Sequence, residues 1–248
     1  MKYALVDGHR REPETGLKGV CQGCGLPMTA KCGQQRVHHW AHRTANCDKW
    51  WECETIWHRE WKNEFPQECQ EVRISSSDGS FHIADVQTPN STVLEFQHSH
   101  LPLVDRRARE SFYVNMVWII DGRRRVSDFP SFAHSLSFAA PDYSKARGWR
   151  LPLVRCAIAE DWATSRSTVY LDFGNTDFSL KKGPSVSHKE LPPSGILWRV
   201  TKAPNDRIVI TPFLRRNVIA HYLHDTPLEG FEPHLRPADG RWDYRSFP

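Results

Sequence analysis

Hydrophobic and polar residues alternate along residues 83–97, and this period of two predicts two short strands joined by a tight turn. Four apolar residues of the two strands hold even positions, whereas Asp85, Glu95 and Gln97 hold odd positions. Because successive side chains of a strand point to opposite faces, one face of this hairpin belongs to the core and the other carries the carboxylates. A three-residue loop at 89–91 would place Asp85 directly opposite Glu95, with their Cβ atoms ~5 Å apart.

The spacing of apolar residues elsewhere predicts helices around this hairpin. Aromatic side chains recur at Trp57, Trp61 and Phe65, so residues 50–66 are expected to form a helix that ends at Pro66. Further elements are predicted as a strand at 71–74, a turn at 75–80, a helix at 103–114 and a buried strand at 116–121. The order helix, strand, strand, strand, helix, strand predicts an α/β domain in which helices flank a small mixed sheet.

Residues beyond 122 carry weaker patterns. The expected elements are an irregular or partly helical connection at 128–148, a strand pair at 153–158 and 168–173, a polar loop at 174–195, a strand near 198–201 or 208–211, and an extended tail at 227–248. We therefore divide the chain into a cysteine- and histidine-rich segment at 1–48, an α/β domain at 49–175 and a C-terminal extension at 176–248.

The composition is that of an ordinary folded protein with a mild positive charge. The 248 residues include 39% hydrophobic and 25% charged positions, with a formal net charge of +4. That charge is compatible with a nucleic-acid partner without requiring one. Apolar runs are shorter than the ~20 residues that span a bilayer, and the first residues lack the apolar region of a signal peptide. We therefore expect a cytoplasmic protein with no membrane span.

Cysteine and histidine occur at metal-ligand spacing near the N-terminus. Cys21 and Cys24 are separated by two residues, and His39 and His42 repeat that separation. Two such pairs match the tetrahedral ligand sets of structural Zn²⁺ in a zinc ribbon or knuckle. An odd total of seven cysteines in a reducing compartment favours metal binding over disulfides. The alternatives are a pair of His38 and His42, replacement of one ligand by Cys32 or Cys47, or a loop whose cysteines and histidines are unrelated.

The hairpin carboxylates predict a second metal site. Asp85 and Glu95 at this distance repel each other unless a proton or a cation lies between them, and Mg²⁺ prefers oxygen ligands while keeping several waters. On the preceding helix, Glu54, His58 and Lys62 share one stripe at four-residue spacing. This stripe is either a solvated face or, beside a metal, a group in which Glu54 assists a metal-bound water and His58 contacts a phosphate or that water. A structural cluster of the two carboxylates with arginines is the alternative without a metal.

Several motifs together resemble the CoiA-like competence proteins. Residues 54–62 read Glu-Thr-Ile-Trp-His-Arg-Glu-Trp-Lys, residues 83–86 read Ile-Ala-Asp-Val, and residues 94–99 read Leu-Glu-Phe-Gln-His-Ser. In that family such a block follows a knuckle of Cys-x-x-Cys and His-Phe-Ala-His, and here His-Trp-Ala-His stands at 39–42. The resemblance covers about residues 18–122 and depends on the motifs occurring together in this order.

The resemblance implies a restriction-endonuclease-like fold of the PD-(D/E)xK superfamily and metal-dependent cleavage of nucleic acid phosphodiesters. By position, Asp85 and Glu95 would hold Mg²⁺ or Mn²⁺. Gln97 stands where many members of the superfamily have lysine, although glutamine is the residue expected in CoiA-like proteins. Because glutamine is neutral, Lys62 or an arginine would supply the missing positive charge.

A catalytic group and a nucleic-acid contact surface follow from this resemblance. Gln97 and Glu54 would orient the attacking water, and the carbonyl oxygen of Phe96 would complete the metal ligands. The expected catalytic residues are Glu54, His58, Asp85, Glu95 and Gln97. The basic residues expected to follow the backbone of nucleic acid, with DNA as the favoured substrate, are Lys62, Arg106, Arg107, Arg109, Arg123, Arg124 and Arg125.

Other functions stay open at this stage. Each arginine group is alternatively a solvated surface. The protein is alternatively a nuclease-fold module that binds DNA without cutting it. It is also open whether the zinc unit or the C-terminal region recruits a protein partner or a second copy of the chain.

Overall fold

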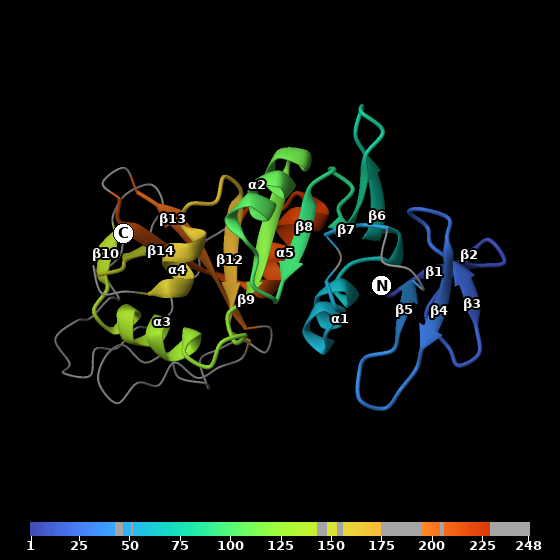
Figure 1. Cartoon of the computed structure of the whole chain (residues 1–248). Coiled ribbons are helices and arrows are strands. Elements are labelled where there is room, and N and C mark those ends of the chain that lie inside the picture. The colour runs from blue at the N-terminus through green and yellow to red at the C-terminus, as the bar shows by residue number, and fades with distance from the viewer. Residues whose placement is uncertain are drawn as a thin grey trace. The chain divides into compact units, whose positions relative to one another are not determined.

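The structure is a computed structural model that describes most of the chain. The described residues are 1–42, 47–50, 52–142, 148–152, 156–174, 195–203 and 206–228. The chain divides into two compact units, Met1–Ser99 and His100–Pro248, which Figure 1 colours along the sequence. The division between these units falls between residues 99 and 100, and the predicted boundaries near residues 48 and 175 stay predictions.

The first unit begins with a small antiparallel sheet of strand order β2-β1-β3-β4-β5. Its strands have only three to five residues and bury little surface. The core beside them is correspondingly small, with Trp40 fully buried next to Ala4 and Met28. Such a core is typical of small folds that need an added constraint. The strands are β1 (Ala4–Val6), β2 (His9–Arg11), β3 (Lys18–Val20), β4 (Pro27–Lys31) and β5 (His39–His42).

Helix α1 (Ile56–Asn63) carries two residues of the predicted aromatic stripe, Trp57 and Trp61, and is shorter than the predicted range of 50–66, so that Phe65 follows it. The side chains of Trp57 and Trp61 are buried, and Trp61 stacks on Phe96 with 5.4 Å between the ring centroids. The four-residue aromatic spacing therefore packs the helix against the hairpin that follows it.

Strands β7 (Phe81–Gln87) and β8 (Val93–Gln97) form the predicted hairpin. Buried and partly exposed residues alternate along β7, which confirms the predicted period of two. The strands pair antiparallel, and their register, continued by one residue, places Asp85 opposite Glu95. The unit also contains the 3₁₀ helix η1 (Gln67–Cys69) and β6 (Gln70–Ser75), which pairs with β7.

The turn of this hairpin has the predicted length of three residues. Thr88 donates its amide hydrogen to the carbonyl oxygen of Thr92 over 2.9 Å, and this bond closes the loop around residues 89–91. Ser91 adopts a left-handed φ of 63°, which is the conformation that completes a three-residue hairpin loop after a type I turn. Local turn chemistry therefore fixes the register that brings the two carboxylates together.

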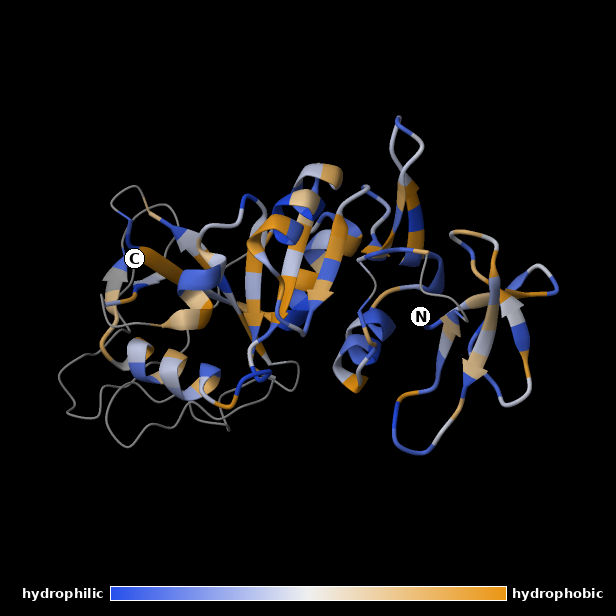
Figure 2. Cartoon of the chain, viewed as in Figure 1, coloured by the Kyte–Doolittle hydropathy of each residue, from blue (hydrophilic) through white to orange (hydrophobic). Residues whose placement is uncertain are grey.

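The second unit is a mixed sheet with helices. Its strand order is β10-β11-β14-β13-β12-β9, in which β9 and β12 are parallel and the other neighbours antiparallel. Figure 2 shows hydrophobic residues concentrated on its strands. The strands are β9 (Met116–Asp121), β10 (Ala140–Asp142), β11 (Gly148–Arg150), β12 (Thr168–Asp172), β13 (Ile196–Lys202) and β14 (Ile208–Leu214), and the helices are α2 (Leu103–Phe112), α3 (Asp128–Ser137), α4 (Ala157–Trp162) and α5 (Arg215–His224). The predicted mixed α/β class is confirmed.

The structure confirms several strands predicted in this unit and corrects one. Strand β9 has the predicted bounds, β12 lies within the predicted strand at 168–173, and both alternatives for a later strand are present as β13 and β14. In the predicted strand at 153–158, residues 153–155 lie outside the described residues, and Cys156 caps α4 instead of continuing a strand. Strand β12 accordingly pairs with β9 and β13.

Other expectations for this unit have mixed outcomes. The connection at 128–148 contains α3 and β10, and α5 was not predicted. The expected polar loop and C-terminal tail fall almost entirely on residues outside the described part of the chain. No helix within the described ranges is both long and apolar enough to cross a membrane.

Candidate functional site

Three thiols and one imidazole converge beside the small sheet of the first unit. Cys21 and Cys24 lie between β3 and β4, His42 ends β5, and Cys47 lies beyond it. Among the residues that the structure describes, these four offer ligand atoms that all lie within 4.8 Å of one another. The sulfur atoms of Cys21 and Cys47 are 3.6 Å apart, and the sulfur of Cys24 lies 3.9 Å from Nε2 of His42.

These separations fit a tetrahedral zinc ion. Zn–S bonds of about 2.3 Å place neighbouring sulfur ligands of a tetrahedron ~3.8 Å apart, and three thiolates with one imidazole are a common ligand set of structural zinc. Cys21 is buried, the other three residues are partly buried, and the three cysteines belong to the small core. Burial raises the pKa of the Cys21 thiol, so loading this site with a metal would release protons. The group therefore fits a closed structural site.

The structure corrects one predicted ligand, because Cys47 takes the place of His39. Strand β5 holds His39 and His42 three positions apart, so their side chains point to opposite faces. Nδ1 of His39 lies 2.8 Å from the carbonyl oxygen of Val37. A two-residue separation brings ligands together in a turn but not along an extended strand. Of the spare thiols, Cys47 joins the group and Cys32 stays outside it.

Contacts with β7 hold both halves of the metal group. The carboxylate of Asp48, next to the fourth ligand, accepts a hydrogen bond from the amide of Ile83 and also lies 2.8 Å from Nδ1 of His82. Gly23, between the first two cysteines, packs closely enough that an added Cβ would lie 2.8 Å from Ile83. The metal group therefore packs on the strand that carries Asp85.

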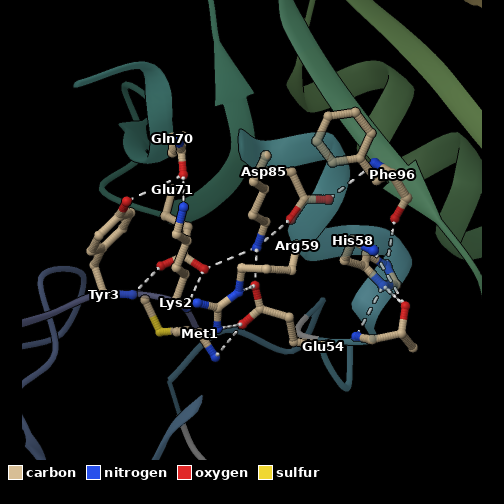
Figure 3. A network of polar contacts seen from close by, with 12 residues as sticks. Met1, Lys2, Tyr3, Glu54, His58, Arg59, Gln70, Glu71, Asp85 and Phe96 are labelled. Carbon is tan, nitrogen blue, oxygen red and sulfur yellow. Dashed lines mark hydrogen bonds and ion pairs between the residues drawn. The ribbon is translucent and has the colours of Figure 1, made fainter. Parts of the chain in front are cut away.

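A buried ammonium group lies among three carboxylates that Figure 3 shows converging from different elements. Nζ of Lys62, in the last turn of α1, lies 2.9 Å from Glu71 and 3.1 Å from Asp85. It also lies 3.6 Å from Glu54. Burial alone would lower the pKa of Lys62, but the three carboxylates raise it well above its usual value. Lys62 is therefore a charged counter-ion that all three acids share.

The predicted stripe of Glu54, His58 and Lys62 is helical only in part. His58 and Lys62 lie one turn apart on α1, whereas Glu54 precedes the N-cap residue Thr55. Oε1 of Glu54 lies 3.2 Å from Nε of Arg59 and faces Lys62 as well. All three stripe residues are buried, so the alternative of a solvated face is wrong.

Glu71 joins the segment before β1 to this group. Its carboxylate accepts hydrogen bonds from the main-chain amides of Lys2 and Tyr3, at 2.7 and 2.9 Å. The φ of Glu71 is 48°, which is uncommon for a residue with a side chain. Burial alone would raise the pKa of Glu71, but the ammonium groups of Lys62 and the N-terminus, with the two amides, lower it to about 2.

This depressed pKa predicts a stability that depends on pH. Because the folded value of about 2 lies below the usual 4.5, the contribution of Glu71 to the free energy of unfolding is fully present above pH 4.5 and is lost as the pH falls through 2. At neutral pH we expect it to be about 3 kcal/mol. Chemical denaturation of the wild type and of Glu71→Gln should give a difference that shrinks across this window. A difference that does not vary with pH would contradict the assignment.

Asp85 is the most accessible carboxylate of the group. Its side chain is 22% exposed, against 3% for Glu71 and for Glu54. Oδ2 of Asp85 accepts a hydrogen bond from the amide of Phe96 over 3.0 Å, and Oε1 of Glu95 accepts one from the amide of Asp85 over 3.2 Å. Each of the two facing carboxylates therefore accepts a hydrogen bond from a backbone amide, next to the last backbone pair of the hairpin. Carboxylates keep further lone pairs, and one or two of them suffice to bind Mg²⁺ with its waters.

The backbone amide and the imidazole of His58 form hydrogen bonds with Thr55 and Phe96. Its amide and its ring form a reciprocal capping box with Thr55 at the start of α1. Because the amide of Thr55 donates to Nδ1, the other ring nitrogen carries the hydrogen, and Nε2 donates to the carbonyl oxygen of Phe96 over 3.0 Å. The carbonyl expected to bind the metal is thus already engaged by the histidine expected to contact phosphate.

Glu52 is a member of the site that the sequence did not reveal. Its Oε2 accepts a hydrogen bond from Nε2 of Gln97 over 3.0 Å and lies 3.6 Å from Nε2 of His58. Its other oxygen accepts the amide hydrogen of Ser99. Burial alone would raise the pKa of Glu52, but the nearby imidazole of His58 and the hydrogen bonds from Ser99 lower it. Glu52 precedes the helix and does not share the four-residue spacing of Glu54, His58 and Lys62, so the sequence pattern did not single it out.

Two of the arginines expected to contact nucleic acid are buried. On α2, Arg106 and Arg109 are 5% and 8% exposed, and Arg107 is partly buried. The guanidinium of Arg106 donates to the carbonyl oxygen of Asp161 over 2.5 Å and to the hydroxyl of Thr164 over 2.7 Å. The expected solvent-facing position is therefore wrong for both residues: acceptors within the second unit bind Arg106, and the guanidinium of Arg109 lies over the ring of Trp118, 5.9 Å from its centroid.

The second arginine group is more accessible. Arg123 is exposed, with Nε 3.8 Å from Asp121. Arg124 is partly buried, and Arg125 forms an ion pair with Asp128 at 2.8 Å. Arg123 is therefore the member of this group that is best placed to meet a phosphate.

Comparison with protein-family models, with curated proteins and with solved structures gives no match to this chain.

Proposed function

We propose that this chain is a metal-dependent nuclease that hydrolyses phosphodiester bonds of nucleic acid, with DNA as the favoured substrate. The observation that carries the proposal is the position of Asp85, which is partly exposed, faces Glu95 across the hairpin and lies 3.1 Å from the charged Lys62. Carboxylate pairs of this kind bind the divalent cations that assist phosphodiester cleavage. The resemblance to CoiA-like proteins supports the same function and a restriction-endonuclease-like core.

The donor set suits Mg²⁺ or Mn²⁺ held by Asp85 and Glu95. When bound, the ion would supply Lewis acidity at a phosphoryl oxygen. Lys62 supports the site because its ammonium lies 3.1 Å from Oδ1 and balances the negative charge of Asp85. This ammonium, which α1 supplies, offers the positive charge that Gln97 cannot offer. The proposed role of Gln97 is to orient a water molecule.

The test compares isosteric variants of the two carboxylates. We expect Asp85→Asn and Glu95→Gln each to lower cleavage by roughly 10²- to 10³-fold or more, the scale of losing a group that stabilises transition-state charge. Cleavage should be measured on linear, circular and single-stranded DNA with Mg²⁺, Mn²⁺ or EDTA. The control is Asp78→Asn, which removes a carboxylate from an exposed turn. Activity at the control level in either test variant would sink the proposal.

A second candidate is a nuclease-fold module that binds DNA without cutting it. The observation in its favour is that Oδ1 of Asp85 already pairs with Lys62 and Oδ2 with the amide of Phe96. Such a module would bind DNA with equal affinity in Mg²⁺ and in EDTA and would leave circular DNA without nicks. An agarose assay for nicked circles, beside a binding titration, separates the two candidates.

A further inference from the structure

The side-chain amide of Gln97 has a fixed orientation. Its Nε2 lies 3.0 Å from Oε2 of Glu52, 3.1 Å from the carbonyl oxygen of Ser99 and 3.3 Å from the hydroxyl of Ser99. An ionised carboxylate and a carbonyl oxygen accept hydrogen bonds and cannot donate them. The amide nitrogen of Gln97 must therefore face Glu52 and Ser99, and its oxygen must face away from them.

That oxygen is a buried acceptor with no assigned use. Gln97 is 2% exposed, and among the described residues its Oε1 has no hydrogen-bond partner. A buried acceptor left without a donor costs about 1–3 kcal/mol. Gln97 lies two positions after Glu95 on β8, so both side chains belong to the same face of the strand. The acceptor therefore lies on the face that carries the Asp85 and Glu95 carboxylates.

Glu52 is held firmly enough to impose this orientation. One oxygen accepts the amide hydrogen of Ser99, and the other lies 3.6 Å from Nε2 of His58. The side chain of Glu52 is 17% exposed. His58 is itself fixed by the capping box with Thr55, so one of the two neighbours that position the carboxylate of Glu52 is held by the start of α1.

We propose that Glu52 is a positioning residue that makes Gln97 present its carbonyl oxygen, and not its amide hydrogens, to the water that attacks the phosphodiester. The inference rests on the proposed nuclease function and adds a residue to it. Gln97 then accepts a hydrogen bond from that water and orients it without taking its proton. A neutral acceptor in this place explains why lysine is not required at position 97.

The first experiment separates orientation from folding. Replacing Glu52 by glutamine removes the ionised acceptor and leaves the carbonyl oxygen of Ser99 as the remaining fixed acceptor for the Gln97 amide. We expect kcat to fall about 10- to 100-fold, the range for groups that orient a metal site from outside it, with an unchanged KM for DNA. Glu52→Asp keeps an ionised acceptor on a shorter side chain, so we expect it to retain more of kcat than Glu52→Gln. Asp78→Asn, which changes a carboxylate on an exposed turn, should leave kcat unchanged.

The second experiment does not depend on activity. The side-chain amide protons of Gln97, assigned by their loss in Gln97→Leu, should exchange slowly with solvent in the wild-type protein and quickly in Glu52→Gln. Equal exchange in both, or a wild-type kcat in Glu52→Gln, would overturn the inference while the nuclease function stands. A wild-type protein that cleaves nothing, yet shows the Glu52-dependent protection, would overturn the nuclease function and support the fixed orientation.

Discussion

Replacing Cys47 by serine should deprive the protein of one equivalent of bound zinc. Cys47 supplies one of the four ligand atoms that lie within 4.8 Å of one another, and its side chain packs in the core of the small sheet. Structural zinc sites have apparent binding free energies of about 10–16 kcal/mol, which also serve as folding free energy. We therefore expect the short strands of the first unit to lose their protection against amide hydrogen exchange. Metal analysis after dialysis and hydrogen exchange of β1–β5 measure the two effects.

The matched control is His39→Ala. Because β5 points this imidazole to the face opposite His42, its removal should leave one equivalent of zinc in place. The opposite pattern, in which His39→Ala loses zinc and Cys47→Ser keeps it, would restore the ligand set expected from the sequence. Equal loss in both variants would mean that zinc depends on the strand as a whole and not on this choice of ligand.

Replacing Lys62 by methionine should destabilise the protein by about 3–5 kcal/mol, the usual effect of leaving buried carboxylates without their counter-ion. The side chain of Lys62 is 6% exposed, and Glu71 and Glu54 are 3% exposed. Methionine fills a similar volume, so the loss of stability is due to the missing charge more than to changed packing. The same variant should lose cleavage, because Asp85 loses the ammonium beside it. Urea denaturation and the DNA cleavage assay measure the two effects.

A double variant tests the electrostatic explanation. Lys62→Met/Glu71→Gln removes the ammonium and the carboxylate 2.9 Å from it, so it should be more stable than Lys62→Met alone. A double variant whose loss equals the sum of the two single losses would show that the residues do not interact, and the shared counter-ion would have to be abandoned.

The local features of the hairpin were predictable from the sequence. Strand parity, a loop of three residues and the resulting register require only neighbouring residues, and the structure confirms them through the closure between Thr88 and Thr92 and the left-handed Ser91. The same is true of β9, whose apolar run is short and bounded by Gly122. In both elements, the pattern and the packing depend on one continuous segment.

The fourth metal ligand illustrates why spacing alone was insufficient. The separation between His39 and His42 has the same count in a turn and in a strand, but only a turn brings the two side chains together. The fully buried Trp40 between them belongs to the core of an extended strand. In a strand, His42 lies on the same face as Trp40 and His39 lies on the opposite face, because their positions differ by an odd number. This difference can be read from the sequence.

The arginines of α2 and the role of Glu52 required contacts that the sequence does not display. Arg106 binds the carbonyl oxygen of Asp161, which lies 55 positions later, and Glu52 binds Gln97 across 45 positions. Helical periodicity assigns arginine to the solvent unless a distant acceptor is known. Tertiary partners of this kind decide burial for charged residues, so their positions are the least predictable part of the site.

The long sequence separation between Glu71 and its hydrogen-bond donors has a consequence for synthesis of the chain. The amides of Lys2 and Tyr3 find their acceptor 69 and 68 positions further on. At about 5–20 residues per second, a ribosome needs roughly 3–14 s to make that stretch. Throughout this interval the amides of Lys2 and Tyr3, which precede β1, lack the carboxylate that accepts their hydrogen bonds in the folded protein. The small sheet, whose strands all lie before residue 43, is therefore synthesised well before the carboxylate that binds the segment in front of β1.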